Sequence, residues 1–101
     1  MHRMNTKLTG LVAAPFTPLR EDGSVNLPMI KPQAAALADN KVSGAFVCGT
    51  TGEGMSLTTD ERQQVAERWV AAAPPALRVF IHVGHLTVAD SCALAAHAER
   101  I

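Results

Sequence analysis

The chain has 101 residues, of which 48% are hydrophobic and 18% are charged, and its formal net charge is zero. This composition predicts one soluble domain with a packed core. The balanced charge argues against nucleic acid or an acidic membrane surface as the main partner, because both select basic proteins. No apolar run approaches the roughly 20 residues of a membrane span. Residues 1–7 lack the apolar core of a signal peptide, so a cytoplasmic location is expected.

Side chains that commonly hold metals are few and scattered. Cys48 and Cys92 are predicted to be small buried apolar residues in a reducing compartment. The four histidines form no tight ligand spacing with them. Neither a metal nor another cofactor is therefore expected.

The first predicted unit is a strand over residues 8–14 followed by a helix. Asn26 suits the N-cap position, and an alanine-rich run favours a helix that ends near Asn40. Pro32 lies inside this helix, so its regular part is expected to begin only around Met29 or to be kinked.

The second unit begins with residues 44–48, which are apolar without alternation, as in parallel strands that are covered on both faces. After a glycine-rich turn, Thr58 and Glu61 form the pattern of a capping box at the start of a helix. Apolar residues at four-residue steps are expected to face the core: Val65, Trp69 and Ala73. Polar residues are expected to lie largely off that stripe: Arg62, Gln63 and Glu67.

Residues 78–83 form the third predicted strand, and Thr87 with Asp90 marks the start of a helix that runs towards the C-terminus. The order of strand and helix, repeated three times, predicts an α/β fold with parallel strands joined by right-handed crossovers. Two architectures use this unit, the open doubly wound sheet and the closed eight-fold barrel, and the element order leaves both open.

The turn Gly49–Gly54, between the second strand and the second helix, is the main candidate for a binding site. Its three glycines leave backbone amides open, and the hydroxyls of Thr50 and Thr51 can donate to the same ligand oxygens. It lacks the Gly-Lys-Ser/Thr ending of a P-loop, and Glu53 would repel a phosphate. A singly charged carboxylate is therefore the favoured ligand, and the alternative is a turn that only reverses the chain.

Four segments stand in an order and spacing that resemble the N-terminal part of the N-acetylneuraminate lyase and dihydrodipicolinate synthase family: residues 10–18, 49–54, 59–62 and 81–84. The resemblance covers residues 7–101. Residues 47–48 and 67–70, together with Ile-His-Val-Gly at 81–84, favour the lyase branch.

The resemblance implies a (β/α)8 TIM barrel of about 250 residues, of which residues 1–101 would supply the first three βα units as one partial domain. The chain is thus expected to be a fragment of a longer, homo-oligomeric enzyme, commonly a tetramer. The implied reaction is aldol cleavage or condensation with pyruvate held as a Schiff base on a lysine, and the implied partners are small keto acids, pyruvate and a sialic acid. The resemblance assigns the grip on the pyruvate carboxylate to Thr50 and Thr51, and it makes Thr50 a candidate for a proton relay with a tyrosine.

The family's catalytic lysine and tyrosine are missing from this sequence. It contains no tyrosine, and none of its lysines, Lys7, Lys31 and Lys41, follows the carboxyl end of a predicted strand. The chain alone is therefore expected to hold no catalytic residue and to be inactive. The alternatives are a dihydrodipicolinate synthase or another pyruvate aldolase of the family, a non-catalytic fragment, and a small anion-binding α/β module.

Other residues near the predicted strand ends are given structural roles. Glu53 is expected to fix its loop, and His82 to be a hydrogen-bonded residue of the core or barrel. His85 lies in a loop on the active face, where contact with a substrate tail is the less favoured alternative. Pro15 and Thr17 are expected to end the first strand, with shaping of the barrel mouth as the alternative.

Overall fold

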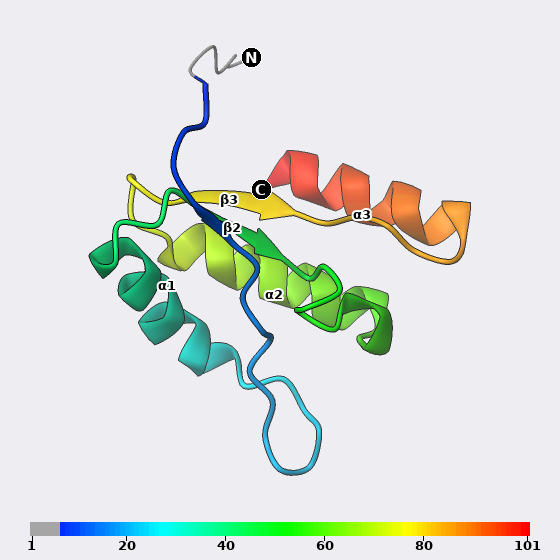
Figure 1. Ribbon diagram of the computed structural model, residues 1–101. Helices are drawn as coiled ribbons and strands as arrows, with labels where there is room; N and C mark the ends of the chain where they lie inside the picture. Colours follow the sequence, from blue (N-terminus) through cyan, green and yellow to red (C-terminus); the bar gives the residue numbers. More distant parts are fainter. Residues whose placement is uncertain (1–6) are drawn as a thin grey trace.

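The computed structural model describes residues 7–101. The N-terminal segment 1–7, in which no signal peptide is expected, therefore lies almost entirely outside the described residues. Three parallel strands form one sheet in the order β1 (Val12–Ala13), β2 (Gly44–Val47) and β3 (Arg78–Ile81). β2 lies in the centre, pairing with β1 through Gly44 and Ala45 and with β3 along its whole length (Figure 1). The predicted parallel α/β topology is confirmed.

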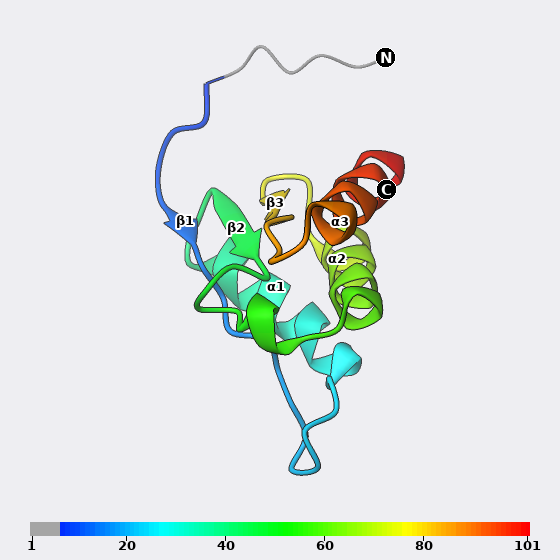
Figure 2. The ribbon, with the colours of Figure 1, turned by 90° about the vertical axis from the view of Figure 1, so that its right-hand side faces the viewer.

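Each strand is followed by a helix. These are α1 (Ile30–Asp39), which is preceded by the 3-10 turn η1 (Leu27–Met29), then α2 (Thr59–Ala72) and α3 (Val88–Arg100). A second 3-10 turn, η2 (Gly54–Ser56), stands between β2 and α2. Seen along the sheet, the helices lie on one side of the strands, with α2 between α1 and α3 (Figure 2). This arrangement leaves the other face of the sheet uncovered by any helix of residues 7–101.

All three strands are shorter than predicted, and each ends for a local reason. Gly10 has a positive φ of 92° and interrupts the run 8–14, so β1 keeps two residues. Cys48 has a φ of 60°, which removes it from β2. β3 stops before His82, whose amide still donates to the Val47 carbonyl oxygen of β2 but whose own carbonyl oxygen bonds to the Arg62 side chain of α2.

The predicted helix starts are mostly correct. Thr58 and Glu61 make a complete capping box on α2, and the hydroxyl of Thr87 accepts from the Asp90 amide at the start of α3. Asn26 precedes η1 and makes no side-chain cap. Pro32 is the third residue of α1, where its missing N–H removes no intrahelical bond, so α1 runs without interruption from Ile30.

The core lies between the sheet and the helices. Ala45 and Val47 of β2 point into it, where they join Val65 and Trp69 of α2, while Phe46 points to the other face and is 37% exposed. Ala73, the last residue of the predicted stripe, is partly buried against this core. Arg62, predicted to lie off the stripe, is only 2% exposed, so that prediction is wrong. It stands three residues before Val65, which places it on the same helix face.

Within residues 7–101, no helix is long and apolar enough to cross a membrane. In the same part of the chain, no three His, Cys, Asp or Glu side chains gather in a way that could hold a metal ion.

Trp69 is the largest fully buried side chain, and its removal should leave a cavity between α2 and the sheet. We expect Trp69→Ala to lower the free energy of unfolding by about 3–5 kcal/mol. The neighbouring Val70 is 38% exposed and serves as a matched control, for which alanine should cost less than about 1 kcal/mol. Urea unfolding followed by far-UV circular dichroism measures both, and equal losses would contradict this description of the core.

Candidate functional site

The turn after β2 is closed by its own backbone. The Glu53 amide donates to the Thr50 carbonyl oxygen, and the Gly54 amide donates to the Gly49 carbonyl oxygen, both at 3.0 Å. At Gly54 a Cβ atom would overlap the carbonyl oxygen of Cys48. Only glycine fits there, and the turn can therefore fold back tightly against the end of β2.

The two predicted ligand residues, Thr50 and Thr51, lie together at the tip of this turn. Both are exposed, and within residues 7–101 neither their amides nor their hydroxyls donate to a protein acceptor. Thr51 also lines an apolar hollow of about 350 Å³, which is bounded by residues of the segment after β1 and of α1: Ala14, Pro15, Phe16, Gln33, Ala36 and Leu37. Adjacent free amides and hydroxyls suit the oxygens of an anion.

Thr17, in the segment after β1, is hydrogen-bonded to the turn Gly49–Gly54. The hydroxyl of Thr17, which is buried, donates to the Gly52 carbonyl oxygen over 2.7 Å. Sequence reasoning assigned Thr17 to strand termination, but β1 ends four residues earlier. Its contact joins the segments that follow β1 and β2, which supports the alternative that Thr17 shapes the mouth of the site.

Glu53 takes part in the turn through its backbone. Its φ is 55°, its amide closes the turn on Thr50, and its side chain is exposed. The expected role in fixing the loop thus belongs to the main chain of this residue.

Arg62 ties α2 to the end of β3. Its Nη1 donates to the Gly84 carbonyl oxygen and its Nη2 to the His82 carbonyl oxygen, each at 2.8 Å. The same Nη2 lies 3.3 Å from Nδ1 of His82. Sequence reasoning missed this residue, although its helical spacing from Val65 and Trp69 carried the signal.

His82 connects the ends of β3 and β2. Its Nδ1 is 3.2 Å from the Cys48 carbonyl oxygen, and its ring lies beside that of Phe46, with 5.6 Å between the ring centroids and 58° between the ring planes. The prediction of a hydrogen-bonded residue is confirmed.

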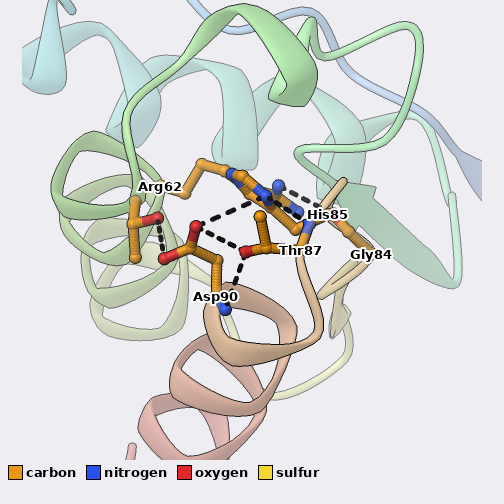
Figure 3. Close-up of polar contacts among 6 residues, drawn as sticks. Arg62, Gly84, His85, Thr87 and Asp90 are labelled. Atoms are coloured by element: carbon orange, nitrogen blue, oxygen red, sulfur yellow. Dashed lines mark hydrogen bonds and ion pairs between the residues drawn. The ribbon is translucent and has the colours of Figure 1, made fainter.

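His85 belongs to a separate cluster at the start of α3, which Figure 3 shows beside Arg62 and Gly84. Its Nδ1 accepts from the Thr87 amide at 3.3 Å and lies 3.6 Å from a carboxylate oxygen of Asp90. The Thr87 hydroxyl donates to the same carboxylate oxygen over 2.7 Å. These contacts fix the loop after β3, and a contact of His85 with substrate stays a prediction.

The two cysteines differ in environment. Cys48 is buried, and this burial raises the pKa of its thiol, while the positive charge of Arg62 acts in the opposite direction. Cys92 is exposed on α3, so the expectation that both cysteines are buried is wrong for this one. Its position off the apolar face of α3 explains the difference, since Leu94 and His97 are the buried residues of that helix.

The site therefore combines an open backbone turn, two threonines and the carboxyl ends of parallel strands. This is where enzymes built on (β/α) barrels place their substrates. The class that fold and site define is a parallel α/β module with an open, glycine-rich turn at the carboxyl end of its second strand.

Comparison with known proteins identifies the family. The model of the dihydrodipicolinate synthetase family matches residues 7–101, and the chain belongs to that family. Among curated relatives, it is 50% identical over 97 residues to the N-acetylneuraminate lyase of Mus musculus and 49% identical over 94 residues to that of Xenopus tropicalis. These matches cover 94% and 91% of this chain, but the chain spans only 30% and 31% of the two relatives.

Solved structures agree with this assignment. The chain superposes on the Proteus mirabilis N-acetylneuraminate lyase with a TM-score of 0.92 and 51% identity, covering 95% of this chain and 32% of that one. The Aquifex aeolicus dihydrodipicolinate synthase gives a TM-score of 0.84 at 32% identity, covering 90% and 31%. The three βα units thus correspond to part of a TIM barrel, as predicted, and the similarity is greater to these lyases than to that synthase.

The contrast between the two cysteines can be measured with a thiol reagent. A thiol reacts as its thiolate, so a buried thiol with a raised pKa reacts slowly. We expect Cys92 to be modified in a fast phase in the native chain and Cys48 to be modified only on unfolding. Intact mass measured over time follows both reactions. In a Cys92→Ser variant the fast phase should disappear, and a fast phase that persists would contradict the buried position of Cys48.

Proposed function

We propose that the chain forms part of a Schiff-base aldolase that cleaves N-acetylneuraminate to pyruvate and N-acetylmannosamine. Its contribution is the turn Gly49–Gly54, which binds the carboxylate of pyruvate. The observation that carries the proposal is the open pair of amides and hydroxyls at Thr50 and Thr51, in a chain about 50% identical to N-acetylneuraminate lyases. The whole enzyme in this proposal is a cytoplasmic homo-oligomer.

In this mechanism the carboxylate of the keto acid lies against Thr50 and Thr51. The charge is then neutralised by backbone dipoles and hydroxyl donors, which hold the keto carbon at a fixed distance from the loop. A lysine amine attacks that carbon and forms the imine with loss of the carbonyl oxygen as water, and the imine then accepts the electron pair of the breaking carbon–carbon bond. Thr50 lies next to the bound carboxylate and takes part in the proton relay with a tyrosine.

The chain contributes binding groups and not the nucleophile. An imine-forming lysine must be deprotonated, which a desolvated pocket promotes. Lys7, Lys31 and Lys41 are all exposed, and the sequence has no tyrosine. Residues 1–101 alone should therefore lack lyase activity.

Two other functions are less well supported. A dihydrodipicolinate synthase would use the same carboxylate loop, but the similarity to the Aquifex aeolicus synthase is only 32%. A self-contained anion-binding module would require a sheet whose edges are covered. In the described residues β1 and β3 are both edge strands, and large apolar side chains such as Leu11 and Phe46 are exposed.

A hybrid enzyme tests the proposal. Residues 7–101 would replace the matching third of the Proteus mirabilis lyase, which is 51% identical. We expect the hybrid to release pyruvate from N-acetylneuraminate, measured by coupling to lactate dehydrogenase. Borohydride added with pyruvate should trap one adduct per hybrid chain and none on residues 1–101 alone, as measured by intact mass. A hybrid with native circular dichroism that releases no pyruvate would contradict the proposal, and an adduct on the 101-residue chain would contradict the assignment of the nucleophile.

Within this hybrid, Thr51→Val keeps the approximate shape of the side chain and removes the hydroxyl. Loss of a hydrogen bond to a charged acceptor should weaken pyruvate binding by about 1.5–3 kcal/mol. Thr51→Ser keeps the hydroxyl and should bind pyruvate nearly as well as the unsubstituted hybrid. Calorimetric titration measures these affinities, and unchanged binding in Thr51→Val would mean that the amides alone hold the carboxylate.

A further inference from the structure

We propose that His82 is a positioning residue for the carboxylate loop: its Nδ1–H donates to the Cys48 carbonyl oxygen and thereby holds the turn that presents Thr50 and Thr51. Arg62 fixes the backbone that carries the imidazole. The inference rests on the proposed function, because it assigns a role in the same site.

The contacts of the ring determine which nitrogen carries the proton. Nδ1 of His82 lies 3.2 Å from the Cys48 carbonyl oxygen and 3.3 Å from Arg62 Nη2. A carbonyl oxygen only accepts and a guanidinium only donates, so one ring nitrogen cannot bond to both. Arg62 Nη2 already donates to the His82 carbonyl oxygen at 2.8 Å, whereas no other donor within residues 7–101 bonds to the Cys48 carbonyl oxygen. A protonated Nδ1 gives that carbonyl its partner, so the proposal takes Nδ1 as the donor to Cys48.

The Cys48 carbonyl stands where the turn is most constrained. Cys48 has a φ of 60°, in the left-handed region that side-chain-bearing residues rarely adopt, and such a conformation persists only where surrounding contacts hold it. The same residue is packed against the turn, since a Cβ at Gly52 would lie 3.0 Å from its amide nitrogen. Thr50 follows two residues later, so rotation of the peptide after Cys48 would redirect the amides at the tip of the turn.

The imidazole itself is held on several sides. Arg62 fixes the carbonyl oxygens of His82 and Gly84, on either side of Val83, and Phe46 contacts the ring. A Cβ at Gly84 would lie 2.8 Å from ring atoms Cε1 and Nε2, so glycine leaves the space that the ring occupies. The ring thus has one orientation, with Nδ1 towards β2.

Three substitutions at His82 in the hybrid enzyme separate hydrogen bonding from packing. Asparagine places an N–H donor near the position of Nδ1, glutamine places one near Nε2, and phenylalanine keeps the ring without a donor. We expect His82→Asn to keep the KM of the unsubstituted hybrid within about twofold. His82→Phe and His82→Gln should raise KM by about tenfold, with kcat changed by less than about twofold, since one hydrogen bond that orients the loop is lost. Equal KM values for Asn and Phe would overturn the proposal.

Hydrogen exchange provides a measurement that does not depend on activity. On the 101-residue chain and on the hybrid, peptides covering residues 48–54 should exchange faster in His82→Phe and in Arg62→Met than in His82→Asn, while peptides from α1 should not change. An inactive but folded unsubstituted hybrid would contradict the proposed function, and the exchange of residues 48–54 would still test the role of His82. Unchanged exchange in His82→Phe would overturn that role.

Discussion

The backbone conformation at the carboxyl ends of β2 and β3 depends on the hydrogen bonds of the buried Arg62 guanidinium. A charge that is taken out of water is costly unless its protons are bonded, so the backbone around it must supply acceptors. The carbonyl oxygens of His82 and Gly84 accept from its two terminal nitrogens, while its Nε has no hydrogen-bond partner within residues 7–101. The His82 amide still donates to the Val47 carbonyl oxygen of β2, but the His82 carbonyl oxygen is turned to Arg62, and β3 ends at Ile81. One side chain from α2 therefore sets both the end of a strand and the path of the loop towards α3.

The two faces of the sheet have different environments. Ala45 and Val47 point towards the helices and are buried, whereas Phe46 and the ring of His82 meet on the opposite face. In a (β/α) barrel that opposite face is the interior, and its carboxyl end is the substrate side. The open turn with Thr50 and Thr51 stands at this end, next to the contact between His82 and Cys48.

A loop that binds through backbone amides depends on geometry more than on particular side chains. Here three contacts shape the loop. The Thr17 hydroxyl donates to the Gly52 carbonyl oxygen, Nδ1 of His82 lies 3.2 Å from the Cys48 carbonyl oxygen, and Gly54 leaves room for that same carbonyl. All three belong to this chain. The contacts that shape the turn thus lie within residues 7–101, whereas this sequence does not supply the lysine and tyrosine of the proposed mechanism.

Local signals in the sequence determined the order of strands and helices, the parallel topology, two of the helix caps and the position of the glycine-rich turn. Those features depend on residues within about one or two helical turns of each other, such as Thr58 and Glu61, so spacing alone reveals them. Only the tertiary structure decided where the strands end, which backbone oxygens Arg62 bonds to, that Cys92 is exposed and that Thr17 supports the loop. Arg62 meets Gly84 across 22 residues and Thr17 meets Gly52 across 35. A partner at that distance leaves no periodic or capping pattern in the chain, because the contact exists only after the sheet has brought the strand ends together.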